Sequence, residues 1–460
     1  VYTCTEDIEE EGLIYAYQIQ SDGQLQQLGD PIGAGGTSTC YLTIDKDQQH
    51  LLVVNYWDST LSVIRINEAT GALEGPIKSM YDPKHGKKMV ASAKKDGGAN
   101  HSCNDASTIQ QRQADPHSHA LVLDPFVGAV AYVPDLGKDV IREFLYDRTE
   151  GKIVHESNML PSGLCTGHPD GPRYLEFHPQ YNVAYVVNEL SSTVAVFEVD
   201  RDLLQEMDAA AGNREDMTRF KGRSTLRLIQ SISTLPPAFP KTMNTCGRIC
   251  VHQSGHFVVV SNRGHQSICV YKVKRRKQGR LDLVGHFHTR GDTPRHFQFD
   301  HSGQYLLVAN QDTDSVAVFD FNLSTGRIQY TGNEYSVPSP NFVCCCPVYP
   351  LMDVDEESVN EGVPAVASVD TAEEELAATS LRHSRHPSLV MRHKASDDGG
   401  ETSDSDDSTF RAHRRPKPKA RTAPASMLAP PSASYPSLEE ELEQARREIE
   451  QLRRLLETRK

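Results

Sequence analysis

The chain lacks the features that mark several common classes of protein. Its 460 residues contain no apolar run near the length of about 20 residues that a membrane span needs. The net charge of −14 argues against a general nucleic-acid binder. Ten cysteines show no framework of paired spacings, which indicates reduced thiols in a cytoplasmic protein. We therefore expect neither a membrane nor a nucleic acid among its partners.

Signatures of phosphate-binding, metal and thiol sites are also missing. Ala34-Gly-Gly36 lacks the lysine and the hydroxyl side chain of a phosphate-binding loop, and it indicates a turn. His117 and His119 form a His-x-His pair, but no third metal ligand is evident near them in the sequence. The cysteines form no Cys-His triad signature. These patterns favour neither metal-dependent nor thiol-dependent chemistry.

What the chain does contain is a repeat of short apolar segments. In each unit an apolar segment ends in Asn or Asp, and a second segment rich in Val, Ile and Phe follows after a polar turn. The alternation and the β-branched content favour strands over helices. Recurrence at roughly 40 to 80 residues is typical of a β-propeller, so we predict an all-β fold. We interpret the residue that ends each segment as a turn former that hydrogen-bonds the backbone; it is Asn55, Asp135, Asn188, Asn262 and Asn310.

Composition predicts three parts. Residues 1–350 have the strand-and-turn pattern of the propeller. Residues 351–436 are polar and low in aromatics, so they are predicted to be a disordered linker that buries little apolar surface. Residues 437–460 carry three heptads, which predict an amphipathic helix and a short coiled coil for self-association or partner binding. A solvated helix without a partner is the alternative for this last part, whose heptad positions are Leu438, Leu442, Ala445, Ile449, Leu452 and Leu456.

Residues that carry chemistry recur at two matching columns of the repeat. The first column opens the strand before each repeated segment, and the second column follows the Asn or Asp. The two columns are 16 residues apart in four units and 17 in the fifth. A hairpin places the start of its first strand beside the end of its second, so both columns lie at one end of the innermost strands. We therefore expect five side chains to converge at one mouth of the propeller channel: His119, Arg173, Glu189, Arg263 and Arg295.

One imidazole, one carboxylate and several guanidiniums in one place suit an anionic substrate. Arginine binds carboxylate or phosphate through two N–H groups and can hold a developing oxyanion. Histidine takes or gives a proton near neutral pH, and a carboxylate orients it or acts beside it. The alternative is that these arginines and the glutamate only form ion pairs between blades.

Five local motifs occur in a specific order along the chain. They are Asp115-Pro-His-Ser-His119, Gly171-Pro-Arg173, Val187-Asn-Glu-Leu-Ser-Ser-Thr193, Ser261-Asn-Arg-Gly-His265 and Val337-Pro-Ser-Pro340. With these motifs, roughly residues 1–347 resemble the lactonase or cycloisomerase-2 family. That family of seven-bladed propellers includes bacterial phosphogluconolactonases and fungal carboxy-muconate cyclases.

The resemblance implies a seven-bladed propeller whose catalytic residues are His119, Glu189, Arg173 and Arg263. It implies no metal and no organic cofactor. Arg112, just before the histidine motif, also matches the family pattern. The candidates for substrate binding are Arg112, His117, Arg295 and Gln311.

The sequence departs from the family pattern at its start and at two insertions. Residues 1–17 resemble the middle of a second blade, so we expect the first blade and the next inner strand to be missing and the sequence to be a fragment. Residues 78–114 are expected to cover the channel mouth. Residues 201–224 are polar and are expected to form a surface excursion with helical character.

Three functions fit these patterns. The first is metal-independent hydrolysis of an anionic sugar lactone such as 6-phosphogluconolactone, with His119 activating water and Glu189 assisting. The second is a cycloisomerase that closes a carboxylated muconate to a lactone with the same residues. The third is a non-catalytic propeller that serves as an interaction platform. The first two differ in substrate but require the same residue types, so the sequence does not separate them.

Overall fold

The computed structural model describes residues 1–83, 106–212 and 215–346. All of them belong to the first of the two units into which the chain divides, Val1–Val359. The predicted linker at 351–436 and the predicted coiled coil at 437–460 lie outside the described residues. So do residues 84–105 of the first insertion.

The described residues form six four-stranded antiparallel sheets. The first sheet contains β1 (Tyr2–Cys4), β2 (Glu11–Ile19), β3 (Leu25–Gln27) and β4 (Ile32–Thr37). The second contains β5 (Thr39–Ile44), β6 (His50–Asn55), β7 (Thr60–Ile66) and β8 (Leu73–Tyr81). The third contains β9 (Val122–Leu123), β10 (Val130–Asp135), β11 (Val140–Asp147) and β12 (Lys152–Pro161).

The remaining three sheets repeat the same order of strands. The fourth contains β13 (Pro172–Phe177), β14 (Val183–Asn188), β15 (Thr193–Val199) and β16 (Leu226–Ser233). The fifth contains β17 (Thr245–Val251), β18 (Phe257–Arg263), β19 (Ser267–Lys274) and β20 (Arg280–His288). The sixth contains β21 (Pro294–Phe299), β22 (Tyr305–Asn310), β23 (Ser315–Phe321) and β24 (Ile328–Ser336).

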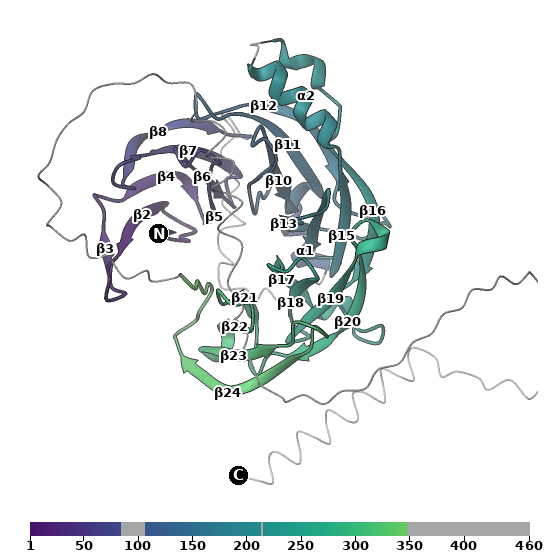
Figure 1. The fold of residues 1–460 in the computed structure, drawn as a ribbon. Helices are drawn as coiled ribbons and strands as arrows, with labels where there is room; N and C mark the ends of the chain where they lie inside the picture. The colour runs from purple at the N-terminus through teal and green to yellow at the C-terminus, as the bar shows by residue number, and fades with distance from the viewer. Residues whose placement is uncertain (84–105, 213–214, 347–460) are drawn as a thin grey trace, which may run out of the picture. The chain divides into compact units, whose positions relative to one another are not determined.

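Within this unit the sheets follow one another around a central axis (Figure 1). Strands β5, β13, β17 and β21 lie innermost, and β8, β12, β16, β20 and β24 lie outermost. The predicted all-β propeller is therefore confirmed. The predicted count of seven blades is not, because the described residues hold six sheets.

The first sheet is narrower than the others. β1 pairs with one edge of β2, from Tyr2↔Ala16 to Cys4↔Ile14. β3 and β4 follow each other along the opposite edge of β2, so this sheet is three strands wide instead of four. Among the strands that the structure describes, none pairs with the other edge of β1. This is the part of the fold where the sequence predicts a missing inner strand.

The asparagines that end the repeated segments connect adjacent sheets. Asn55, Asn188, Asn262 and Asn310 are all buried. Each donates from Nδ2 to a backbone carbonyl 21 to 28 residues earlier in the chain; the acceptors are Ala34, Ser162, Thr234 and Thr289, at 2.8 to 3.1 Å. The predicted backbone hydrogen bond is present, but its acceptor lies in or just after the last strand of the preceding sheet, not in a local turn.

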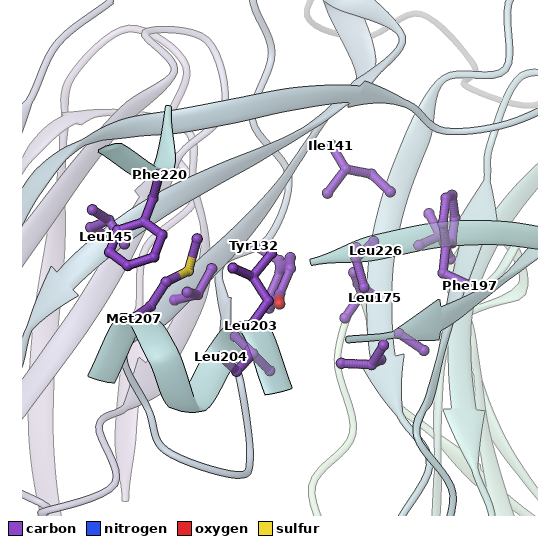
Figure 2. Close-up of a cluster of buried hydrophobic side chains, with 14 of the residues drawn as sticks. Tyr132, Ile141, Leu145, Leu175, Phe197, Leu203, Leu204, Met207, Phe220 and Leu226 are labelled. Carbon is purple, nitrogen blue, oxygen red and sulfur yellow. The ribbon is translucent and has the colours of Figure 1, made fainter. Parts of the chain in front are cut away.

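The insertion at residues 201–224 contains a helix with one apolar face. Helix α2 (Arg201–Gly212) is followed by the short helix η3 (Met217–Phe220). Figure 2 shows Leu203, Leu204 and Met207 of α2 packed with Phe220 against side chains of the third and fourth sheets. The predicted helical character is confirmed. Burial of this apolar face stabilises the contact between the insertion and the propeller.

Other helices are short. Helix α1 (Ala106–Arg112) ends the first insertion and places Arg112 in its last turn. The other 3-10 turns are η2 (Leu136–Lys138), η4 (Lys241–Met243), η5 (Arg275–Lys277) and η6 (Gln311–Thr313).

Candidate active site

Bulges in the innermost strands direct the first-column side chains. In β5, β13 and β21 the pairing shifts by one residue, and the residue at the shift is Cys40, Arg173 and Arg295 respectively. In β17 the shift falls at Gly247 and Arg248. A bulge leaves its extra residue unpaired and changes the direction of its side chain. The first column of the sequence therefore corresponds to bulge positions in these strands.

His119 is held at the inner edge of the third sheet by an extension of β9. An isolated bridge joins Ser118 to Asp135, beyond the end of the regular pairing. The His119 N–H donates to the Pro134 carbonyl at 3.0 Å. His119 therefore occupies the place that Arg173 occupies in the fourth sheet.

Three arginines contact the carboxylate of Glu189, which follows β14 and is 0% exposed. Glu189 Oε1 lies 2.6 Å from Arg112 Nη2 and 2.8 Å from Arg263 Nη2. Glu189 Oε2 lies 2.9 Å from Arg173 Nη1. Arg263 Nη2 also donates to the Cys246 carbonyl at 2.7 Å. Arg112, Arg173, Glu189 and Arg263 thus form one buried cluster, called the Glu189 cluster below.

His119 lies beside the Glu189 cluster within an aromatic enclosure. Arg173 Nη1 donates to His119 Nε2, so Nε2 is the acceptor nitrogen and the ring proton resides on Nδ1. The ring meets Tyr56 and Tyr174 edge to face, with centroids 5.1 Å and 5.3 Å away. The guanidinium of Arg173 also lies 5.0 Å from the Tyr174 ring centroid. Tyr56 accepts a hydrogen bond from Arg112 at 3.4 Å, which connects the enclosure to the cluster.

Burial and the neighbouring charges set the protonation states of the site. Burial, and then the charge of Arg173, hold the pKa of His119 well below its usual range, so the imidazole is neutral near pH 7. Burial alone would raise the pKa of Glu189, but Arg112, Arg263 and Arg173 hold it well below its usual range. Burial lowers the pKa of Arg263 to about 10, despite the opposing charge of Glu189. The site therefore combines a neutral base, His119, with the one carboxylate and three guanidiniums of the Glu189 cluster.

Several polar atoms of the site have no hydrogen-bond partner among the described residues. They are Arg112 Nη1, Arg173 Nε, Arg263 Nε and His119 Nδ1, all buried. Unpaired buried donors are costly, and they are common where a ligand completes the bonding. Because the guanidiniums outnumber the carboxylate, the group that satisfies these donors is expected to be an anion.

The other predicted site residues lie at the edge of this group or form bonds elsewhere. His117 stacks on Tyr56 with ring centroids 4.8 Å apart. Arg295 donates to Glu6 at 3.0 Å, between the sixth and first sheets. Gln311 donates to Ser339 at 3.4 Å. The structure thus brings together His119, Arg173, Glu189, Arg263 and Arg112, with His117 adjacent.

Sequence reasoning did not select Tyr56 and Tyr174 as site residues. Tyr56 occupies the same column as Glu189 and Arg263, which was a usable signal. Tyr174 directly follows Arg173, and its position became informative only once the bulge placed its ring beside His119.

Two features are absent from residues 1–83, 106–212 and 215–346. Among those residues no group of three or more His, Cys, Asp or Glu side chains is arranged to hold a metal ion. No helix there is long and apolar enough to cross a membrane.

The fold and the site define an all-β propeller with a buried cationic cluster on its inner strands. The chain belongs to the family described as lactonase, 7-bladed beta-propeller, whose profile matches residues 1–345. A curated relative from Bacillus subtilis (strain 168), named 6-phosphogluconolactonase, is 30% identical over 338 residues. That match covers 73% of this chain and 81% of the relative.

Solved structures show the same fold. The periplasmic gluconolactonase PpgL of Pseudomonas aeruginosa is similar with a TM-score of 0.58 and 24% identity, over 74% of this chain and 83% of that one. A protein from Lactobacillus plantarum is similar with a TM-score of 0.57 and 24% identity, over the same shares of the two chains.

Proposed function

We propose that the protein hydrolyses an anionic sugar lactone of the 6-phosphogluconolactone type without a metal. The observation that carries this proposal is the neutral His119 beside a Glu189 cluster whose remaining donors are unpaired. The relative named 6-phosphogluconolactonase, at 30% identity, supports the reaction class.

In the proposed mechanism the arginines bind the charges of substrate and transition state. An anionic group of the lactone draws Arg173 away from His119 Nε2, which becomes free to accept a proton. Water then attacks the lactone carbonyl carbon and gives its proton to Nε2. Arg263 and Arg112 stabilise the tetrahedral oxyanion, and Glu189 fixes both guanidiniums.

Collapse of that intermediate completes the reaction. The carbonyl re-forms, the ring carbon–oxygen bond breaks, and the departing alkoxide takes the proton back from His119. The product is the open hydroxy acid, and the enzyme returns to its starting protonation state. Because the step needs no redox partner, it agrees with the proposal that no cofactor takes part.

The test is steady-state kinetics of the complete protein on 6-phosphogluconolactone, corrected for spontaneous hydrolysis. Parallel assays use a carboxy-muconate, since a cycloisomerase would use the same arginines on carboxylates. Turnover of the lactone supports the proposal, and turnover of the muconate alone assigns the cycloisomerase. A folded protein inactive on both compounds contradicts a catalytic role and favours an interaction platform.

The proposed function has a consequence for cellular location and another for self-association. A cytoplasmic location would supply a phosphorylated sugar lactone as substrate. Self-association through residues 437–460 would not alter the chemistry of residues 1–350. Removing 437–460 should lower the number of chains in each particle, measured from its mass in solution, while leaving lactone turnover unchanged. An unchanged number of chains contradicts association through these heptads.

A further inference from the structure

On four of the innermost strands, the residue that directly follows the first-column residue belongs to a second layer of side chains. These residues are Tyr41, Tyr174, Arg248 and His296, from β5, β13, β17 and β21. The rings of Tyr41 and Tyr174 are 5.5 Å apart. Arg248 Nη2 lies 3.5 Å from Glu176 Oε1, two residues beyond Tyr174. These contacts connect the second, fourth and fifth sheets.

The second layer adjoins the Glu189 cluster. Tyr174 of the second layer contacts Tyr41 within that layer. It also contacts His119 and Arg173 of the first layer, which is formed by the first-column side chains. Burial, followed by the charges of Arg248 and Arg173, lowers the pKa of His296 to about 2. The innermost strands β17 and β21 lie side by side, so Arg248 and His296 hold matching positions on neighbouring sheets.

His296 presents an unpaired donor in this layer. Its side chain is buried, with the residue 2% exposed, and its ring stacks on Phe342 with centroids 3.8 Å apart. The Val343 N–H donates to His296 Nδ1 at 3.2 Å, so the proton of the neutral ring resides on Nε2. No described residue accepts a hydrogen bond from Nε2.

Arg248 adds positive charge and a second unpaired donor. Its Nε is buried without a hydrogen-bond partner among the described residues. Its contact with Glu176 is a single one at 3.5 Å, longer than a good charge-assisted hydrogen bond. Glu176 Oε2 meanwhile accepts from the Val251 N–H at 3.2 Å. The Nε–H of Arg248 therefore remains available to a ligand.

We propose that Arg248 and His296 form a distal subsite that binds a second anionic group of the substrate, a carboxylate or a phosphate. The proposal rests on the proposed function, in which the lactone ring lies against His119. It makes these two residues determinants of specificity: the protein selects lactones that carry a second charge over uncharged ones. Tyr41 and Tyr174 provide the surface along which the carbon chain lies between the two layers.

Calorimetric binding of three stable acids to the complete protein tests this subsite. Gluconate has one carboxylate, glucarate has two, and 6-phosphogluconate has a carboxylate and a phosphate. Wild-type protein should bind glucarate or 6-phosphogluconate about 10- to 100-fold more tightly than gluconate, the range expected for a charged hydrogen-bonded contact. The acid with the larger preference identifies the group that the subsite takes.

Arg248→Gln and His296→Phe should each reduce this preference several-fold or more. His296→Phe keeps an aromatic ring to stack on Phe342, and a melting curve shows whether either variant is folded. The matched control is Arg65→Gln on β7, because Arg65 is 57% exposed and pairs with Glu74 at the surface. The control should keep the wild-type preference.

Two results overturn the subsite, and they differ from failure of the proposed function. Wild-type protein that binds gluconate as tightly as the other two acids has no distal subsite, although the lactone site stands. A folded Arg248→Gln variant that keeps the full preference also excludes it. A wild-type protein that binds none of the three acids contradicts the subsite and the proposed function together.

Discussion

Glu189 and Arg263 form an ion pair of 2.8 Å in which each side chain is 1% exposed. Two further arginines contact the same carboxylate, so a single negative charge holds three buried positive charges. Removing two charges from water is costly, and a buried pair is stable only while both members are present. This arrangement makes Glu189 a structural support for the arginines as well as a part of the proposed site.

The first prediction is that Glu189→Gln destabilises the protein by about 3–5 kcal/mol, the usual cost of removing one partner of a buried ion pair. The change is nearly isosteric, so the effect reports charge and not volume. Unfolding in urea gives the difference. The control, Glu74→Gln, removes a half-exposed partner of Arg65 and should cost less than about 1 kcal/mol. Equal effects of the two substitutions would contradict the role of Glu189.

The second prediction concerns the fork geometry of arginine. Arg173→Lys and Arg263→Lys retain charge but lose the planar pair of N–H groups that holds a carboxylate or phosphate. Lysine also deprotonates more easily, and burial already lowers the pKa of Arg263 to about 10. We expect kcat/KM to fall at least tenfold in each variant while both stay folded. If melting temperature falls but kcat/KM does not, the arginines serve only as ion pairs between sheets.

Much of the fold could be predicted because the repeat imposes it. The segments ending at Asn55, Asn188 and Asn310 share one alternation pattern, and each becomes a strand in the same place of its sheet. The distance between the two columns placed Arg173 beside Glu189, since a hairpin leaves no other choice. Local pattern and global fold agree at these positions.

The remainder depended on backbone detail that side-chain patterns do not encode. Asn262 donates to the carbonyl of Thr234, directly after the last strand of the previous sheet, so this contact depends on how adjacent blades pack. Arg295 lies in the predicted column, but its guanidinium donates to Glu6 in the loop between β1 and β2. The sequence did not indicate Arg248 as a site residue, because Arg248 follows the first-column residue Gly247 and only the bulge in β17 reveals its position.

The third prediction concerns His119 and pH. As the proposed base, His119 must be neutral, and its pKa is held well below 6.5 by burial and Arg173. The acidic limb of the kcat/KM profile should therefore lie well below pH 6.5. His119→Ala should lower kcat by about 10²- to 10⁴-fold, while His256→Ala, at an exposed position, should not. A half-loss of wild-type activity near pH 6.5, or full activity in folded His119→Ala, would exclude His119 as this base.

A buried carboxylate outside the Glu189 cluster has the opposite behaviour. Glu143 on β11 is 0% exposed, and it accepts hydrogen bonds from the Ser224 hydroxyl at 2.9 Å and from Thr225 Oγ1 at 3.1 Å. No arginine or lysine pairs with it among the described residues. Burial raises its pKa from 4.5 to about 7, more than these hydrogen bonds lower it.

The fourth prediction follows from that raised pKa. Between pH 4.5 and 7 the folded protein holds the Glu143 proton more tightly than the unfolded chain, so its stability falls as pH rises and levels off above 7. The loss is about 3 kcal/mol, because each pKa unit corresponds to about 1.36 kcal/mol. Glu143→Gln cannot ionise, so its stability relative to wild type should increase by that amount from pH 4.5 to pH 7.

Urea unfolding of both proteins across this pH range measures the difference, and taking the difference cancels the other titrating groups. Glu150→Gln, an exposed change in the following turn, is the control and should show no such trend. A variant whose stability relative to wild type stays constant with pH would mean that Glu143 ionises normally in the folded protein.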